Sequence, residues 1–379
     1  MTTRQHRPSL QPSLQQQVAR FRLQRHHLAQ ATACDPVTIA RSVCGMQAQV
    51  MTAAFLQIWA RNHSVSRNEI EAALWQKRSL IKTSLMRQTL HLVPADEFPT
   101  YIAALRSSRV AAVLRIMAKF KISPEESGDL TSLSVDSLCA GPRGWAAIRA
   151  AVRPKVSKRV RSWMDRVWSI VRIPVSEGLI CYGPGENNET TFICVDQWLG
   201  RPMPAVPEEQ ARSALLRGYL RTYGPATLTD FCHWSGMPAG EVRPLPGLLA
   251  DELAEVEIEK TKCLLLREDL EALRQLKPEK SYVRLLPHFD PYLLAHRKKD
   301  HLVETRHYKR VYRNQGWISP VVLVEGSVAG VWAYERKSKK LDVTIEPFGK
   351  LSRAERFAIA QEAKEIAAFL DCAVEVTIR

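Results

Sequence analysis

The chain has 379 residues, of which 45% are hydrophobic and 25% charged, a composition typical of a soluble globular protein with roughly two to four domains. No apolar run reaches the roughly 18 residues needed to cross a bilayer, and Met1 to Gln17 contains no apolar core, so we expect neither a membrane span nor a secretory signal. The eight cysteines form no C-x-x-C pair, which disfavours zinc ribbons and common iron–sulfur sites and predicts reduced thiols in a cytoplasmic protein.

The charge is positive and unevenly distributed. The formal net charge is +15, and the stretch 141–172 carries nine Lys or Arg residues against one acid, Asp165. The stretch 277–340 carries fourteen against six. Such basic stretches indicate a polyanion partner. A merely solvated basic face is the alternative, and membrane-surface binding is disfavoured because no continuous apolar face accompanies the charge.

Helical segments open the chain. Residues 1–15 contain few apolar groups and are expected to form a disordered lead, followed by a helix over 16–31. Asp35 is placed to cap a second helix, which Pro36 begins and which ends before Gly45.

A β segment follows the opening helices. Thr52 is expected to cap a third helix, and Ser66 with Glu69 predicts the capping box of a fourth. The run 79–93 is rich in Leu, Ile, Thr and Val and predicts a β segment. Helices followed by a β segment are typical of a winged helix, which we assign to residues 16–130.

Two glutamines, Gln47 and Gln49, lie on the link after Gly45. In an extended link, residues two apart point the same way, so both amides can face one spot. Paired amides can organise water and stabilise a cation without carrying charge. Surface amides or a helix cap are the alternative interpretation of these residues.

The helix and hairpin pattern recurs twice. Residues 131–206 predict short helices, a basic helix and a hairpin whose tip is 183–188. Residues 207–278 predict a long helix, a second helix capped by Thr227, a turn at Gly236 and another hairpin. Both segments are therefore assigned as further winged helices.

The last hundred residues differ from the rest. Alternating apolar and polar segments, a helix over 352–370 and a final strand over 373–378 predict a β-rich α+β domain over 279–379. The predicted fold class is α+β, with tandem winged helices (helix-turn-helix variants) followed by this domain.

Five short motifs occur in order between roughly residues 16 and 376. They are Gly45-Met46-Gln47-Ala48-Gln49; Arg87-Gln88-Thr89-Leu90-His91-Leu92-Val93; Tyr223-Gly224-Pro225-Ala226-Thr227 with Trp234-Ser235-Gly236; Leu286-Pro287-His288-Phe289-Asp290-Pro291-Tyr292; and Gly316-Trp317-Ile318 leading to Val324-Glu325-Gly326 and Gly330-Val331-Trp332. In this combination the chain resembles the AlkZ/YcaQ-type family of winged-helix DNA glycosylases.

The resemblance implies that the winged helices and the C-terminal domain together form a basic channel for double-stranded DNA. It implies removal of alkylated bases and, in some members, unhooking of interstrand crosslinks. The family's catalytic motif is Gln-x-Gln in one branch and Gln-x-Asp in the other, so the implied catalytic residues are Gln47 and Gln49. We further expect no cofactor, no membrane partner and a cytoplasmic, nucleoid-associated monomer.

The chemistry fits a substrate that already carries charge. A purine alkylated at N7 or N3 is positively charged and leaves readily, so no strong acid is required, while the sugar develops oxocarbenium character. Two glutamine carbonyls can hold the attacking water and face that cation. No lysine stands out as a Schiff-base nucleophile, so we predict a monofunctional hydrolase without strand cleavage.

Several other residues are candidates for DNA binding. If 79–93 is a continuous strand, Arg87, Thr89 and His91 share one face, where Arg87 can bind a phosphate. For His91, three interpretations are open: a structural role, a DNA contact and catalysis.

Asp290 is the candidate for a supporting carboxylate, because aromatic residues flank it and many cations lie near it in sequence. A turn aspartate before Pro291 is the equally weighted alternative. The nearby histidines lack metal-ligand spacing, so we predict no metal site and expect a basic DNA-facing surface. That surface comprises Arg297, Lys298 and Lys299.

Three classes of function compete. Besides a glycosylase, the sequence allows a non-catalytic winged-helix DNA-binding protein or transcriptional regulator, because charge alone explains binding. An RNA-binding or scaffold protein is a third possibility, but no RNP-type aromatic motif supports it.

Overall fold

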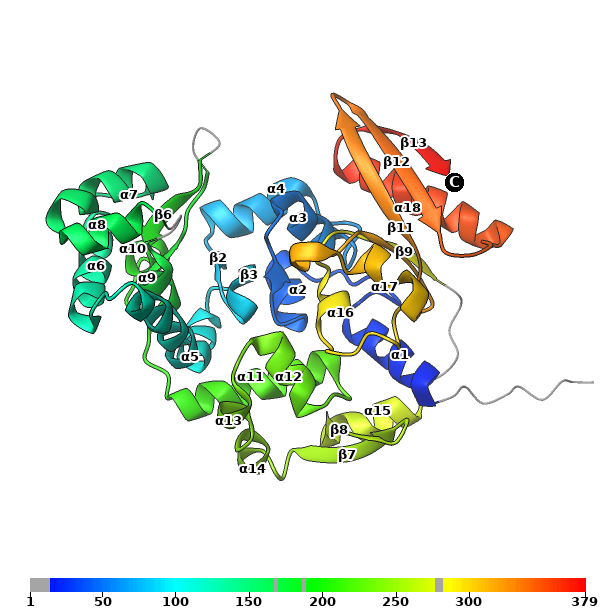
Figure 1. Ribbon diagram of the computed structural model, residues 1–379. Coiled ribbons are helices and arrows are strands. Elements are labelled where there is room, and N and C mark those ends of the chain that lie inside the picture. Colours follow the sequence, from blue (N-terminus) through cyan, green and yellow to red (C-terminus); the bar gives the residue numbers. More distant parts are fainter. Residues whose placement is uncertain (1–13, 167–169, 186–188, 277–281) are drawn as a thin grey trace, which may run out of the picture.

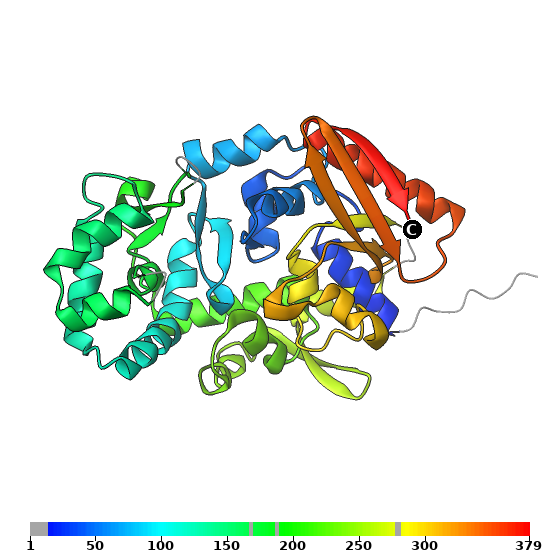
Figure 2. The ribbon, with the colours of Figure 1, turned by 45° about the horizontal axis from the view of Figure 1, so that its top comes forward.

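The structure, a computed structural model, describes residues 14–379 except 167–169, 186–188 and 277–281. Many helices combine with three sheets, which confirms the predicted α+β class. Figures 1 and 2 show the sheet of the C-terminal residues at one end of the molecule and a group of helices, α6 to α8, at the other. The predicted lead 1–15 lies outside the described residues except for its last two positions.

The first helices follow their capping signals closely. Their bounds are α1 Leu14–Arg25, α2 Pro36–Ser42, α3 Met51–Trp59 and α4 Arg67–Glu71. The Asp35 carboxylate accepts hydrogen bonds from the N–H groups of Val37 and Thr38, and Ser66 forms the predicted capping box with Glu69. The prediction for Thr52 is wrong, because α3 begins one residue earlier and has no side-chain cap.

Six short strands form one sheet in the order β1-β3-β2-β5-β6-β4. Their bounds are β1 Met46–Gln47, β2 Leu80–Ser84, β3 Leu90–Pro94, β4 Arg143–Gly144, β5 Ile180–Tyr182 and β6 Thr191–Cys194. Strand β3 pairs antiparallel with both β1 and β2, whereas β2 and β5 are joined only through Lys82 and Tyr182. Hairpins from the first two predicted winged helices therefore share a sheet.

The predicted continuous β segment over 79–93 is wrong in its middle. A tight turn at residues 85–89 separates β2 from β3, and Arg87 and Gln88 adopt left-handed backbone angles there, with φ of 53° and 59°. Arg87, Thr89 and His91 therefore do not lie along one strand face. No Gly, Pro, Asn or Asp marks this turn, so the sequence carried no local sign of it.

Long helix α5 (Phe98–Lys119) connects the first hairpin to a helical group, which lies at the left of Figure 2. The elements of this group are α6 Pro124–Asp136, α7 Trp145–Val152, α8 Lys158–Met164, α9 Arg172–Ser176 and α10 Val195–Leu199. The predicted hairpin tip 183–188 lies partly outside the described residues.

The third helix–hairpin unit agrees with its predicted signals. It contains α11 Glu208–Tyr223, α12 Leu228–Ser235, α13 Ala239–Val242, α14 Leu245–Leu248, the hairpin β7 Leu253–Ile258 and β8 Thr261–Leu266, and α15 Leu270–Arg274. Thr227 caps α12 in a capping box with Asp230, and Gly236 ends that helix with a φ of +80°.

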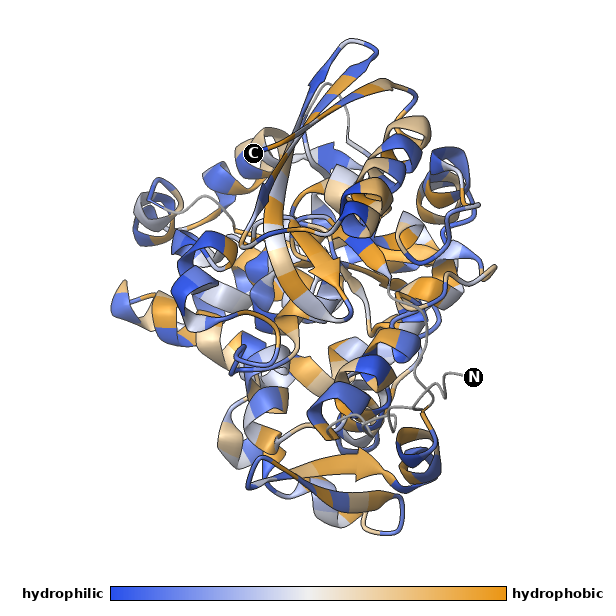
Figure 3. Cartoon of the chain, turned by 90° about the vertical axis from the view of Figure 1, so that its right-hand side faces the viewer, coloured by the Kyte–Doolittle hydropathy of each residue, from blue (hydrophilic) through white to orange (hydrophobic). Residues whose placement is uncertain are grey.

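The C-terminal residues form a five-stranded sheet in the order β13-β12-β11-β10-β9, covered by α18. The bounds are β9 Val283–Leu286, α16 Pro291–Leu294, α17 Tyr308–Val311, β10 Val321–Val324, β11 Ser327–Lys337, β12 Lys340–Pro347, α18 Arg353–Phe369 and β13 Ala373–Ile378. The predicted strands and final helix are confirmed. The outer end of the β11–β12 hairpin is hydrophilic, as Figure 3 shows.

One hydrophobic core joins the two ends of the chain. Buried residues of the first hundred positions, including Leu23, Trp59 and Leu92, belong to the same cluster as Leu286 and Trp332 of the C-terminal sheet. The core therefore crosses the predicted boundary at residue 279. Among the described residues, no helix combines the length and hydropathy of a membrane span.

Candidate active site

Gln47 lies in β1, at the edge of the six-stranded sheet, directly opposite His91 of β3. Gly45 permits this approach: its φ is +93°, and a Cβ atom at this position would lie 2.8 Å from Val93 Cγ1. Because only glycine adopts this conformation readily and lacks the clashing atom, the glycine sets the position of Gln47.

Gln47 is held by one hydrogen bond to its side chain and one to its backbone. Its Oε1 accepts a hydrogen bond of 3.1 Å from Arg87 Nη2, and its backbone oxygen accepts one of 3.1 Å from Gln57 Nε2. The side chain is 5% exposed. The hydrogen bond from Arg87 and the burial therefore restrict the orientation of this amide.

Arg87 connects Gln47 to the third helix–hairpin unit. Its Nη1 donates to the backbone oxygen of Trp234, at the end of α12. The following turn also approaches closely, because a Cβ at Gly236 would lie 3.1 Å from the Arg87 backbone. Burial lowers the pKa of Arg87 to about 10, so the guanidinium stays charged at neutral pH. Both terminal nitrogens of Arg87 donate to protein acceptors, and the predicted phosphate contact stays a prediction.

A buried ion pair is connected to Gln47 through a chain of hydrogen bonds. Asp290 and Arg61 are each 0% exposed and form two hydrogen bonds of 2.9 Å. Arg61 Nη1 also donates to the backbone oxygen of Gln57 at 2.8 Å, and the Gln57 amide binds the backbone oxygen of Gln47. Asp290 additionally caps α16 by accepting from the N–H of Tyr292. This carboxylate therefore acts on the site through Arg61 and Gln57.

Gln49 has different surroundings from Gln47. The predicted non-helical link is confirmed: Gln47 lies in a strand, Val50 has extended backbone angles, and the chain bends at Gln49 and Val50 before α3 begins. The Gln49 side chain is exposed and lines a cleft of about 560 Å³, whereas Gln47 is not part of the cleft lining.

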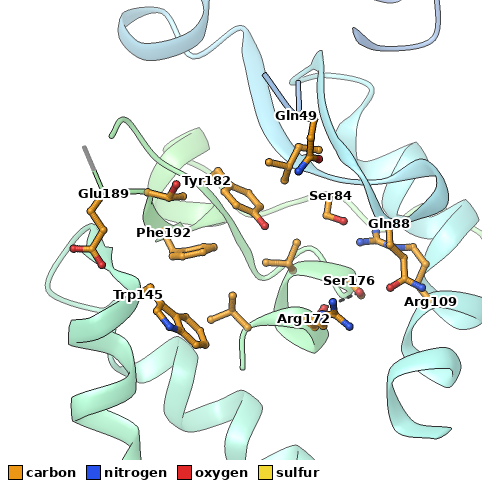
Figure 4. A pocket seen from close by; sticks show the side chains of 14 residues that line it. Gln49, Ser84, Gln88, Arg109, Trp145, Arg172, Ser176, Tyr182, Glu189 and Phe192 are labelled. Atoms are coloured by element: carbon orange, nitrogen blue, oxygen red, sulfur yellow. Dashed lines mark hydrogen bonds between the residues drawn. The ribbon is translucent and has the colours of Figure 1, made fainter. Parts of the chain in front are cut away.

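The cleft lies between the first hairpin and the helical group that follows it. Figure 4 shows Gln88, Arg109 and Arg172 toward one side of the cleft, with Gln49 above them and the aromatic side chains on the other side. The aromatic side chains are Trp145, Tyr182 and Phe192. The cleft thus combines a polar, cationic side with an aromatic wall, and its volume is within the range of ligand sites.

The cleft also contains one carboxylate. Glu189 lies at the edge farthest from Arg109 in Figure 4, and its Oε1 accepts a hydrogen bond of 3.2 Å from the N–H of Ala146 in the first turn of α7. Helix N-termini favour such negative groups. This hydrogen bond holds the Glu189 carboxylate at the rim of the cleft.

His91 is a buried structural residue. It is 2% exposed, and its Nδ1 lies 2.8 Å from the backbone oxygen of Thr89. Because a carbonyl only accepts, Nδ1 carries the proton. Burial and the charge of Arg87 lower the pKa of His91 to about 3. This burial favours the structural interpretation of His91 over the predicted DNA contact. The Thr89 hydroxyl donates to the backbone oxygen of Met86 within the turn, and the DNA contact predicted for Thr89 stays a prediction.

The low pKa of His91 predicts a measurable effect of pH on stability. Between pH 6.5 and about 3 the unfolded imidazole binds a proton that the folded one does not. The free energy of unfolding therefore falls as the pH is lowered through this range. We expect His91→Gln to reduce that slope by up to about 1.4 kcal/mol per pH unit. Urea unfolding at pH 5.5 and 4.5 measures it, and an unchanged slope would show that the folded imidazole titrates normally.

Only two of the three residues of the predicted basic surface after α16 are exposed. Arg297 and Lys298 are exposed, in agreement with a surface role. Lys299 is 5% exposed, and its Nζ donates to the backbone oxygen of Leu293 at 2.9 Å and lies over the Tyr312 ring. Burial lowers its pKa to about 7. The prediction that Lys299 forms part of the surface is therefore wrong.

One group of possible metal ligands occurs among the described residues: His63, Glu362 and Glu365. Glu362 already binds Arg284 at 3.1 Å and accepts from the N–H of Leu285. Burial raises the pKa of Glu362 to about 7. A carboxylate that pairs with a guanidinium is a poor cation ligand, and this group lies outside the cleft.

Sequence reasoning missed the residues that complete the site. Gln57 could have been noticed, because it is a polar residue within the apolar helix α3. Arg109 and Trp145 carried no such sign, since both are ordinary residues of helices whose position in the cleft depends on long-range packing.

Comparisons with known proteins identify the family of this chain. Residues 40–369 match the protein family described as DNA glycosylase AlkZ-like. The chain is 31% identical over 366 residues to an interstrand DNA cross-link repair glycosylase of Streptomyces sahachiroi. The alignment covers 93% of this chain and 95% of that protein. The structure of the Streptomyces sahachiroi DNA glycosylase AlkZ matches with a TM-score of 0.84 at 28% identity, covering 98% of this chain and 100% of that one. The chain therefore belongs to the AlkZ-like family of DNA glycosylases and is a hydrolase that acts on DNA.

Proposed function

We propose that this glycosylase hydrolyses the N-glycosidic bond of purines alkylated at N7 or N3 in double-stranded DNA, and that it unhooks interstrand crosslinks. The observation that carries the proposal is Gln49, a neutral amide that opens into a cleft next to the rigidly held Gln47. The cross-link repair activity named for the Streptomyces sahachiroi relative supports the second part.

A pair of neutral amides suits a cationic substrate. An N7- or N3-alkylated purine leaves without protonation, so the enzyme has to position water and stabilise the oxocarbenium-like sugar. The Gln49 carbonyl supplies a dipole for both tasks, and preorganised dipoles of this kind contribute strongly to catalysis. The hydrolysis leaves an abasic site and a free base, and no strand cleavage is part of the reaction.

The two glutamines have different roles in the proposed reaction. Gln49 faces the reacting sugar and the attacking water, because it is the exposed member of the pair. Gln47 keeps one lone pair on Oε1 beside the hydrogen bond from Arg87, and it contributes a second acceptor whose direction Arg87 determines. Both remain the proposed catalytic residues.

The helix–hairpin units act as tandem winged helices that line a basic channel for DNA. Exposed cations support this arrangement, namely Arg172 of α9 in the cleft lining and Arg297 and Lys298 on the surface after α16. These residues contact phosphates and give salt-dependent, sequence-independent affinity. The enzyme works as a monomer without a cofactor, and it acts in the nucleoid of the cytoplasm.

The test is base release from duplex DNA that carries N7-methylguanine. Wild-type protein should produce heat-labile abasic sites, whereas the Gln47→Ala/Gln49→Ala double variant should bind the duplex and release no base. A second duplex with a defined interstrand crosslink tests unhooking by the appearance of separable strands. Absence of release from both duplexes by a protein that binds them tightly would favour a non-catalytic DNA-binding function.

A further inference from the structure

The guanidinium of Arg109 is buried, and two of its nitrogen atoms have no hydrogen-bond partner among the described residues. Arg109 lies in the middle of α5 and is 6% exposed. Its Nε and Nη1 are buried and form no hydrogen bond with the residues that the structure describes. None of the ion pairs within the described part of the chain includes Arg109 either.

Such an arrangement is costly for the free protein. Buried charges are normally paired with an opposite charge, and buried N–H groups normally have an acceptor. Burial lowers the pKa of Arg109 to about 10, which leaves the guanidinium charged at neutral pH. The cost is explained if the residue binds an anion that is part of the substrate complex.

The surroundings of Arg109 indicate where that anion lies. Arg109 lines the cleft together with Gln49, Gln88 and Ser84, which supply neutral hydrogen-bonding groups on the same side (Figure 4). The carboxylate of Glu189 is at the opposite edge, so it does not compete for this position. The charge of Arg109 also lowers the pKa of His91, which places the guanidinium within electrostatic reach of the Gln47 region.

The positive charges near the site create a problem that an anion would solve. Arg87 and Arg109 both act electrostatically on His91, so a cation that develops on a sugar bound nearby would meet like charges that repel it. A backbone phosphate of DNA is the anion that reaches the cleft with every substrate molecule. It matches the fork of a guanidinium, which binds phosphate oxygens through two N–H groups.

We infer that Arg109 binds a backbone phosphate of the lesion-bearing strand within the cleft, next to the nucleotide that Gln49 contacts. The inference rests on the proposed function, since it requires damaged DNA in this cleft. The phosphate satisfies Nε and Nη1 and offsets the cationic charge beside the reacting sugar. Arg109 thereby fixes the register of the damaged strand relative to Gln49.

The test is a double-mutant cycle between Arg109 and the phosphates of the substrate. A series of duplexes contains 2′-fluoro-7-methylguanosine, which resists hydrolysis, and one uncharged methylphosphonate linkage at successive positions around it. Dissociation constants are measured for wild type, Arg109→Met and Arg109→Lys. One linkage should weaken wild-type binding about ten- to hundredfold and leave Arg109→Met unaffected, with Arg109→Lys between them.

The controls separate this contact from general effects. Arg115→Met, an exposed arginine of the same helix, should keep the full wild-type sensitivity to that linkage. If Arg109→Met does not fold, as thermal melting would show, Arg109→Gln takes its place in the cycle. The inference is overturned if every linkage weakens the Arg109 variant as much as wild type.

The outcome is independent of the proposed chemistry. Base release is measured separately with an unmodified N7-methylguanine duplex. Coupling at one linkage without base release would contradict the proposed function and leave the phosphate contact standing. Base release without coupling at any linkage would support the proposed function and contradict the phosphate contact.

Discussion

Gln49→Ala is expected to slow base release by about 10²- to 10³-fold while leaving the affinity for the duplex nearly unchanged. The exposed Gln49 amide makes no hydrogen bond that holds the described fold together, so its removal acts on the reaction. The effect should appear in the rate of the chemical step, because a dipole aimed at the developing cation acts in the transition state.

Single-turnover kinetics with excess enzyme over an N7-methylguanine duplex measures that step. Gln210→Ala, an exposed glutamine of α11, is the matched control and should retain the wild-type rate. A Gln49→Ala rate within a fewfold of wild type would remove Gln49 from the chemistry.

Asp290→Asn is expected to lower the free energy of unfolding by about 3–5 kcal/mol. The substitution leaves the guanidinium of Arg61, which is 0% exposed, without its carboxylate partner. Breaking a fully buried pair is far more costly than losing an exposed one, because the remaining charge has no water around it. The same loss should loosen Gln57 and therefore Gln47, so the folded variant should also release base more slowly.

Urea denaturation at neutral pH measures the stability change. Glu71→Gln, which breaks the exposed Arg67–Glu71 pair of α4, is the control and should cost less than about 1 kcal/mol. Adding Arg61→Met to Asp290→Asn should recover part of the loss, because it removes the stranded charge. A cost below that of the control would show that the pair contributes nothing to stability.

The sequence predicted those elements whose signals act locally. The caps at Asp35, Ser66 and Thr227 each involve residues two or three positions away, and all three are confirmed. The turn before β3 was missed because Arg87 and Gln88 adopt left-handed angles without a glycine, and tertiary contacts at Trp234 and Gly236 stabilise it. Contacts that join residues 147 positions apart leave no local pattern.

The sequence predicted the two candidate glutamines but not the residues that surround them. The Gln-x-Gln motif identified Gln47 and Gln49 from five neighbouring residues. A buried structural role was one of the open interpretations of His91, whereas the burial of Lys299 was not anticipated, because charged residues are usually exposed. Arg109 reaches the cleft only because α5 packs beside the shared sheet.

The hydrophobic core that unites Leu23 and Trp59 with Leu286 and Trp332 has a consequence for shortened genes. A reading frame that stops before the C-terminal sheet would lose one side of that core and leave the other side facing water. Its product would aggregate or be degraded, since large exposed apolar surfaces are not tolerated in solution. A nonsense mutation late in the gene should therefore abolish the enzyme as completely as one near its start.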